Sequence, residues 1–442
     1  MPSWCGDALD PGSRLGIETK SDIKDLLIWC ARKGASDIIF QAGQPVLVSL
    51  DGELKSVTRQ WMQSEDMRRV ANALAGSESI VARLYAGNDV DVAVEYEVAD
   101  ELDDGGFPVT YRFRANMTAG YYDSGLGMQI VLRYIKWRPP RPEDIDLEPE
   151  ILAEATPAQG AVILAGETGS GKTTTTAALK RYILEGRSSL RGIILTYEAP
   201  IEFLFGNIPS SCCTIAQQEI PKHLPTFAAG VRNALRRNPC LIEIQEMRDM
   251  ETIMAAVEAA NTGHAVYATA HANSVAHTLR RLTQMFPTDQ QGPAFYDVLW
   301  STHLIVSQVL VPKLGGGRVC LREWQVLTPE LKRMLEAAGP GRAFEALQSE
   351  IRKGEAGRAM IETVRLKCEA GLLSTETAVR VLRRYGYRAE ADALARTAPD
   401  NEPAGGVASH ETHLSEHAPC DASRRTSLFQ QTVPSSAPVS DF

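Results

Sequence analysis

One stretch of the chain, residues 160–184, constrains its fold more than any other. Its centre reads GETGSGKT over residues 166–173 and fits the pattern G-x-x-x-x-G-K-[ST]. The apolar residues 161–164 before it are typical of a buried strand, and residues 174–184 after it predict a helix. Because strand, glycine-rich turn and helix follow one another in this order, the match predicts a phosphate-binding P-loop rather than a turn that holds nothing.

The residues of this turn have chemistry that suits a nucleotide and Mg²⁺. Glycine lets the backbone curl so that successive N–H groups point inward at the start of a helix, where an anion binds. Lys172 is expected to reach the β- and γ-phosphates, and the hydroxyl of Thr173 to ligate Mg²⁺. The predicted nucleotide-binding residues here are Gly166, Glu167, Thr168, Gly169, Ser170, Gly171, Lys172, Thr173 and Thr174.

Composition excludes several other classes of protein. The chain has 442 residues with 44% hydrophobic and 23% charged content, which is enough for two or three globular domains. A net charge of -9 supplies no global basic field for nucleic acid. We expect no membrane-spanning helix and no secretory signal. The eight cysteines include no C-x-x-C pair, so we expect neither zinc nor a disulfide framework, but reduced thiols in a bacterial-type cytosol.

The first third of the chain predicts a small domain of its own. Residues 1–20 are rich in proline and glycine and are expected to form a flexible leader. Residues 21–136 predict an α+β domain with an antiparallel sheet, in which Ser21 caps the first helix. Residues 137–149 hold four prolines and many charges, which predicts an extended linker.

The rest of the chain predicts a larger domain and two appendages. Short apolar strands alternate with helices over residues 150–328, which is the pattern of a doubly wound α/β domain with a mainly parallel sheet. Residues 329–396 predict helices throughout. Residues 397–442 are rich in Pro, Ser, Thr and Ala, and we expect them to be disordered.

Two acidic segments follow predicted strands of the larger domain. Glu198 and Glu202 come after the apolar residues 193–196, and Glu246 comes after residues 241–244. Because ligands lie at the carboxyl ends of parallel strands, Glu198 is a candidate to orient water or bind Mg²⁺, and Glu246 to polarise water. The alternative for the first segment is a pair of solvated loop carboxylates.

Two histidines bracket the predicted strand at residues 265–269. His264 precedes it and His271 follows it, and an imidazole there could sense the γ-phosphate or contact a neighbouring subunit. The alternative is a pair of structural histidines. Glu243, inside another predicted strand, is unusual because a charge in a strand covered on both faces is costly unless it is paired.

Taken together, the segments GETGSGKT, YEAPIEF, NPCLIEIQEMRDMETI, TGHAVYATAHANS and RRLTQMFP resemble the PilT-type secretion ATPase superfamily. They match its Walker A motif, Asp box, Walker B motif and His box. The resemblance covers roughly residues 21–330, and the YEAPIEF and QVLVP…LREWQV segments are most similar to DotB/TraJ-type ATPases of type IVB secretion and conjugation.

The resemblance implies a RecA-like ATPase domain behind a PAS-like N-terminal domain, with ATP and Mg²⁺ as ligands. It assigns water orientation to Glu198 and the Walker B role to Glu246, either of which could also face Mg²⁺ with Thr173. His264 and His271 correspond to the His-box pair. Family members also bring N-terminal arginines to the nucleotide, and the matching strands carry Arg112, Arg114 and Arg133, whose alternative is a solvated strand face.

The sequence departs from the family pattern at three positions. Family members usually have an apolar residue at the position of Glu243 and glycine at that of Gln245, and often aspartate at that of Ala199. These changes could slow hydrolysis or be absorbed by new partners.

The resemblance implies a ring, most often a hexamer, that hydrolyses ATP in the cytoplasm and acts on secretion or conjugation proteins at the inner membrane. Alternatives are a pilus-retraction ATPase, a nucleic-acid translocase and a scaffold that binds ATP without hydrolysing it. The acidic net charge and the lack of a basic, aromatic-lined segment make direct nucleic-acid binding the weaker alternative.

Overall fold

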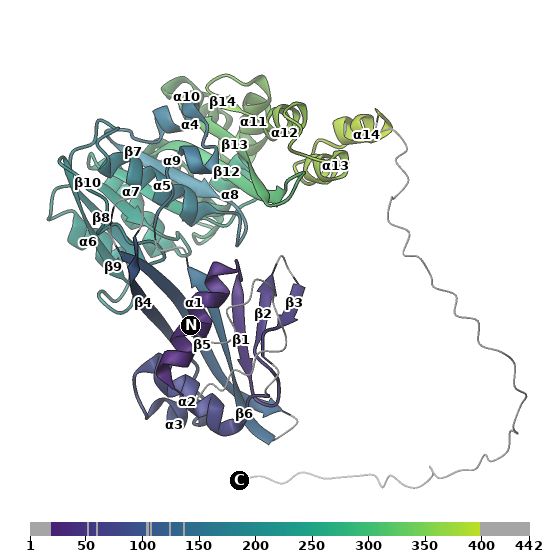
Figure 1. Ribbon diagram of the computed structural model, residues 1–442. Helices are drawn as coiled ribbons and strands as arrows, with labels where there is room; N and C mark the ends of the chain where they lie inside the picture. Colours follow the sequence, from purple (N-terminus) through teal and green to yellow (C-terminus); the bar gives the residue numbers. More distant parts are fainter. Residues whose placement is uncertain are drawn as a thin grey trace, which may run out of the picture. The chain divides into compact units, whose positions relative to one another are not determined.

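The structure is a computed structural model, shown as a ribbon in Figure 1. It describes residues 19–50, 53–58, 61–102, 106, 108–122, 125–135 and 138–397. The predicted leader and tail therefore lie outside the described residues, apart from Thr19, Lys20 and Thr397.

The first region is a six-stranded antiparallel sheet with three helices, as predicted. Its strand order is β3-β2-β1-β6-β5-β4. Ile38 and Phe40 on β1 alternate with half-buried neighbours and pack in one core with Leu26 of α1 and Val70 of α2. The elements are α1 (Lys20–Arg32), β1 (Asp37–Gln41), β2 (Leu47–Leu50), β3 (Glu53–Ser56), α2 (Ser64–Ala75), α3 (Ile80–Tyr85), β4 (Val90–Leu102), β5 (Pro108–Tyr122) and β6 (Gly125–Ile135).

The start of α1 differs from the prediction. Thr19, not Ser21, is the N-cap: its side chain accepts a hydrogen bond from the N–H of Asp22 at 3.2 Å. The carboxylate of Asp22 accepts one in return from the N–H of Thr19 at 2.7 Å. This reciprocal capping box satisfies two N–H groups at once, whereas Ser21 lies inside α1 as its second residue.

The second region is an eight-stranded sheet of order β14-β13-β12-β7-β11-β10-β8-β9. Six of its strands are parallel, and β13 and β14 run antiparallel at one edge. Its elements as far as β13 are α4 (Pro149–Glu154), β7 (Gly160–Ala165), α5 (Lys172–Leu184), β8 (Gly192–Glu198), β9 (Cys213–Glu219), α6 (Phe227–Ala234), β10 (Pro239–Ile244), α7 (Met250–Asn261), β11 (Ala265–Ala270), α8 (Val275–Gln284), α9 (Gln291–Ser301), β12 (Thr302–Pro312) and β13 (Arg318–Val326).

This sheet is covered on both faces, which confirms the doubly wound α/β prediction. Successive residues of β7 enter opposite cores: Ala161 and Ile163 pack in the core that contains α7 and α8, whereas Val162 and Leu164 pack in the core that contains α5. Continuous apolar runs are therefore what both faces require. The prediction missed β9, a half-buried edge strand with a largely polar sequence.

Residues 138–149 are not free chain, although their composition predicts a linker. They contain a short 3₁₀ turn, Glu143–Ile145. Arg181 of α5 donates to the carbonyl oxygen of Pro139 at 2.7 Å, and Arg322 of β13 donates to that of Ile145 at 3.1 Å. This segment is thus fastened to the large sheet and its helices.

The last region is helical as predicted, with one exception. Gly357 and Arg358 form β14, which pairs with Gln325 and Trp324 of β13 and extends the sheet by one short strand. None of the helices in the described ranges is long and apolar enough to cross a membrane. The elements are α10 (Pro329–Ala338), α11 (Pro340–Lys353), β14 (Gly357–Arg358), α12 (Met360–Glu369), α13 (Thr375–Arg384) and α14 (Arg388–Thr397).

Candidate nucleotide site

The glycine-rich turn joins the end of β7 to the start of α5, as the sequence predicts. Gly169 and Gly171 have φ values of +78° and +88°, in the left-handed region that favours glycine. At Gly166 a Cβ atom would lie 2.4 Å from Oγ of Ser170 and 2.5 Å from the carbonyl oxygen of Gln308. The turn therefore depends on glycine for both its curl and its close packing. No side chain caps α5, so its first N–H groups face the turn.

Lys172 is held by the turn itself. Its Nζ donates to the carbonyl oxygens of Gly166 at 2.8 Å and Glu167 at 3.0 Å. Burial lowers the pKa of Lys172, while the nearby carboxylates of Glu246 and Glu202 oppose that shift. Both hydrogen-bond partners are neutral carbonyls, so the ammonium charge can pair with a phosphate placed in the turn.

Gln308 of β12 fixes the turn, and the sequence analysis did not assign it a role. Its Nε2 donates to the carbonyl oxygen of Ser170 at 2.7 Å, and its Oε1 accepts from the hydroxyl of Thr175 at 3.0 Å. Gln308 is buried, and a buried amide among the mostly apolar residues 304–312 was the signal that could have identified it.

Glu246 and His271 meet beside the P-loop. They follow β10 and β11, which are neighbouring parallel strands, and His271 Nε2 lies 3.3 Å from Oε1 of Glu246. Burial and the charge of Lys172 hold the pKa of His271 below its ordinary value of 6.5, while Glu246 opposes them. This shift favours the neutral imidazole of His271, next to a carboxylate that faces the lysine of the P-loop.

His264 lies at the other end of β11. Ala265 pairs with Gly160 at the start of β7, whereas Ala270 pairs with Ala165 at its end. An extended strand of this length separates the two histidines by about 23 Å. The ring of His264 instead faces the hydroxyl of Thr262 at 3.4 Å. The structure thus brings His271 to the P-loop and leaves His264 away from it within one chain.

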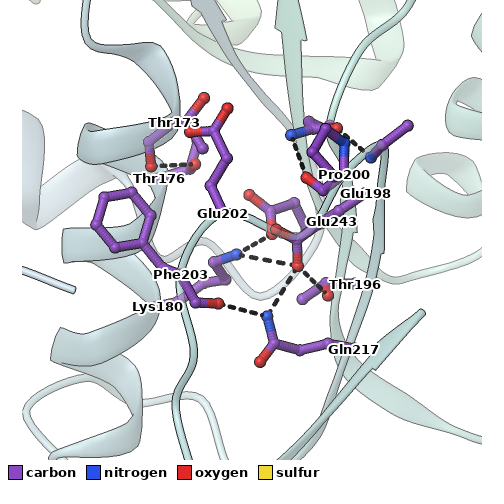
Figure 2. Close-up of polar contacts among 12 residues, drawn as sticks. Thr173, Thr176, Lys180, Thr196, Glu198, Pro200, Glu202, Phe203, Gln217 and Glu243 are labelled. Atoms are coloured by element: carbon purple, nitrogen blue, oxygen red, sulfur yellow. Dashed lines mark hydrogen bonds and ion pairs between the residues drawn. The ribbon is translucent and has the colours of Figure 1, made fainter. Parts of the chain in front are cut away.

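The two glutamates of the Asp box point in different directions, as Figure 2 shows. Glu198 is buried, and its Oε1 accepts hydrogen bonds from the hydroxyl of Thr196 at 2.6 Å and from Nε2 of Gln217 at 3.0 Å. Glu202 instead accepts a hydrogen bond from the side chain of Thr173. Burial raises the pKa of Glu202, and Thr173 opposes the shift. The carboxylate beside the predicted Mg²⁺ ligand is that of Glu202.

The unusual residues of the Asp box and Walker B segment bond to each other. Oε1 of Gln245 accepts from the backbone N–H of Ala199, and its Nε2 donates to the carbonyl oxygen of Pro200 at 3.2 Å. A side chain at this position, where the family usually has glycine, therefore ties β10 to the start of the Asp-box loop.

The three arginines from the first sheet have different surroundings. The side chain of Arg112 is buried; its Nε lies 2.9 Å from Glu95 and its Nη1 donates to the carbonyl oxygen of Glu202 at 3.3 Å. Arg114 lies 3.6 Å from Asp91 and Arg133 lies 2.8 Å from Asp37, and both are largely exposed. Of the three, Arg112 donates a hydrogen bond to the Asp box, and the charge of Arg114 opposes the rise in the pKa of Glu202.

Comparison with known proteins identifies the family. Residues 127–397 match the model of the type II/IV secretion system protein family. PilU, a type IV pilus ATPase of Pseudomonas aeruginosa, is 30% identical over 383 residues, covering 86% of this chain and 90% of PilU. The pilus retraction ATPase PilT of the same organism is 29% identical over 328 residues, covering 74% of this chain and 89% of PilT.

Solved structures give the same result. The ATPase DotB of Legionella pneumophila superposes with a TM-score of 0.75 at 35% identity, covering 84% of this chain and 98% of DotB. That of Yersinia pseudotuberculosis superposes with a TM-score of 0.77 at 32% identity, covering 84% and 96%. The chain therefore belongs to the type II/IV secretion system protein family, with the fold of its P-loop ATPases.

Proposed function

We propose that this P-loop ATPase hydrolyses Mg·ATP to drive a type IVB or conjugative secretion apparatus from the cytoplasmic face of the inner membrane. The observation that carries the proposal is the meeting of Lys172, Thr173, Glu202, Glu246 and His271 at one edge of the large sheet. They supply a phosphate-binding cation, oxygen donors and a neutral imidazole in one place. The similarity to two DotB ATPases over most of both chains supports the secretion role.

The donors in the site fit Mg²⁺. The hydroxyl of Thr173 and the carboxylate of Glu202 are hard oxygen donors and are hydrogen-bonded to each other, and Glu246 follows the neighbouring β10. Bound there, Mg²⁺ would neutralise charge on the β- and γ-phosphates. Lys172 would hold the same phosphates as the other positive charge.

Two carboxylates are available for the attacking water. Glu246 faces the site together with His271, and we assign to it the polarisation of water. The Asp-box role expected of Glu198 we assign instead to Glu202, because Oε1 of Glu198 is already held by Thr196 and Gln217. Glu198 then acts by holding the loop that carries Glu202.

The work step would couple the two regions of the chain. Arg112 reaches the Asp box from the first sheet, so contacts that depend on the γ-phosphate would bias the angle between the regions across residues 137–149. We further propose a hexameric ring, which would bring residues such as His264 of one subunit to another subunit's nucleotide. Sedimentation with Mg·ATP that finds monomer alone would contradict the ring.

Steady-state phosphate release tests the activity. Wild type is expected to turn over ATP, and Lys172→Ala to lose at least about 100-fold. Lys332→Ala is the control, since Lys332 is a half-buried lysine that also donates to a carbonyl oxygen, that of Trp300, but lies on α10. ATP binding without ADP production would favour the scaffold alternative, and DNA-stimulated turnover would favour the translocase.

A second candidate function is type IV pilus retraction, favoured by the similarity to PilT and PilU over most of their lengths. A pull-down with Glu246→Gln, which should bind ATP and hydrolyse it slowly, separates the two. Recovery of pilus platform proteins would support retraction, and recovery of a secretion or conjugation apparatus would support the first proposal.

A further inference from the structure

A buried ion pair lies directly beneath the Asp box. Lys180 is on the third turn of α5, and Glu243 is on β10, between β8 and β11. The side chains are 2% and 3% exposed, and Nζ of Lys180 contacts Oε2 of Glu243 (Figure 2). The same Nζ lies 3.9 Å from Oε1 of Glu198.

Stability alone does not explain this pair. Removing two charges from water costs more free energy than most buried pairs recover, and well-packed apolar residues of similar size often serve as well or better. Lys180 also lies over the ring of Phe205, with its Nζ 4.8 Å from the ring centroid. The pair must therefore be explained by what its charges hold in place.

Lys180 keeps its positive charge despite its burial, because two carboxylates lie close to it. Burial by itself would lower its pKa, but Glu198 and Glu243 outweigh burial and raise the pKa above the ordinary 10.5. One ammonium thus serves two carboxylates, and the side chain of Thr176 also opposes the rise that burial causes in the pKa of Glu243. Losing Lys180 would leave two carboxylates buried without a cation.

The cluster holds both ends of the Asp-box loop. At one end, Lys180, Thr196 and Gln217 all approach the same oxygen, Oε1 of Glu198. At the other end, Nε2 of Gln217 also donates to the carbonyl oxygen of Phe203 at 2.8 Å. The residues between these two points include Glu202.

Helix α5 touches this loop at two levels. Thr173, in its first turn, meets Glu202, while Lys180 lies about 10 Å further along the axis and meets Glu198. Because both contacts come from one rigid helix, they fix the position of the Asp-box loop relative to the P-loop.

We propose that Lys180, paired with Glu243, is a positioning residue for the ATPase reaction: it holds Glu198 and, through the loop 199–203, places Glu202 against Thr173. The inference rests on the proposed function. Lys180 touches neither the P-loop turn nor the reacting atoms, so it acts through Glu198 and Glu202.

The first test is the double variant Lys180→Met/Glu243→Leu, which removes both charges and keeps the volume apolar. We expect a thermal midpoint close to that of wild type, a kcat reduced at least about tenfold because the loop is misplaced, and a KM for ATP changed less than about threefold. A kcat at the wild-type level in the folded double variant would overturn the proposal. If this double variant does not fold, Lys180→Gln/Glu243→Gln takes its place. It keeps side chains of similar size that can hydrogen-bond to each other, and the same outcomes decide the test.

The matched control removes another buried pair. Arg322 and Glu148 are 2.9 Å apart, are 1% and 9% exposed, and belong to β13 and the chain before α4, away from the Asp box. Because Arg322 also holds residues 145 and 146, the readout for Arg322→Met/Glu148→Leu is hydrogen exchange in residues 199–203, which should stay within about twofold of the wild-type rate. Faster exchange there would show that any buried pair has this effect, which contradicts a specific role for Lys180.

A double-mutant cycle asks whether Lys180 acts through Glu202. Glu202→Gln should lower kcat, and adding Lys180→Met to it should lower kcat little further, because both changes remove the same contribution. Fully additive losses would contradict the pathway through Glu202.

Hydrogen exchange separates this inference from the proposed function, because it needs no turnover. Backbone amides in residues 199–203 should exchange faster in Lys180→Met/Glu243→Leu than in wild type and in the Arg322/Glu148 control. Unchanged exchange would overturn the positioning role even if the protein is an ATPase. Faster exchange in a chain without ATPase activity would support the role while the proposed function fails.

Discussion

The two sheets use ion pairs in opposite ways. In the antiparallel sheet, Arg133 pairs with Asp37 on the surface, and the arginine side chain is 70% exposed. In the large sheet, Lys180 and Glu243 make the same kind of pair with almost no exposure. The arginine of the first pair is already stabilised by water, whereas the second pair lies under a helix that covers the sheet and must be satisfied internally.

The difference shows that the free-energy cost of removing one partner of an ion pair depends on whether the remaining charge can be hydrated. At the surface, a released carboxylate is hydrated and little free energy is lost. Between the sheet and α5, a released carboxylate or ammonium stays buried, so each partner depends on the other.

The largest stability effect is expected for Glu243→Leu alone. It leaves the buried ammonium of Lys180 with only Glu198, 3.9 Å away, and should lower the free energy of unfolding by about 3 to 5 kcal/mol. Urea unfolding measures it. A loss of unfolding free energy as small as that for a surface ion pair would contradict the difference between buried and surface pairs.

Arg112→Met sharpens the comparison from the other side, because Arg112 is a buried arginine in the antiparallel sheet. Its partner Glu95 is 47% exposed and can take up water after the change. We expect a loss of about 1 to 2 kcal/mol, smaller than for Glu243→Leu despite similar burial of the mutated side chain. Chemical denaturation monitored by circular dichroism checks it; a loss equal to that of Glu243→Leu would mean that partner exposure is not decisive.

Glu323 gives a pH dependence in the large sheet. Burial raises its pKa, while the N–H groups of Val275 and Met360 oppose the shift. Because the folded-state pKa is above the unfolded value, its contribution to stability is complete below the ordinary 4.5 and is lost as pH rises through the folded pKa. Glu323→Gln should therefore gain stability relative to wild type between pH 4.5 and 7, as measured by unfolding at several pH values. A difference that does not change with pH would exclude this linkage.

The smallest effect is expected for Arg133→Ala. The guanidinium is exposed, and Asp37 keeps the hydrogen bond from the hydroxyl of Ser36 at 2.9 Å, so we expect a change below about 0.5 kcal/mol that vanishes in high salt. Unfolding at two salt concentrations measures it, and a salt-independent loss above 1 kcal/mol would remove the contrast between the sheets.

Local patterns predicted much of the fold. The strand, glycine turn and helix at the P-loop are where the sequence placed them, because phosphate chemistry and glycine conformation are local requirements. Thr19 shows the limit of such reasoning, since several polar residues near a helix start could cap it, and only the hydrogen bonds select one. The polar edge strand β9 was missed because pairing with β8, not its own pattern, makes it a strand.

The site divides in the same way. Sequence by itself determined the glycine-rich turn and named Glu246 and His271, because each lies just after a buried parallel strand and such strand ends share one edge. Tertiary structure alone decided that Glu202 faces Thr173 while Glu198 faces inward, and that Glu243 is matched by a lysine 63 residues away. These contacts form because packing places α5 against the large sheet and brings together side chains that are far apart in the sequence. No local sequence pattern encodes such distant neighbours.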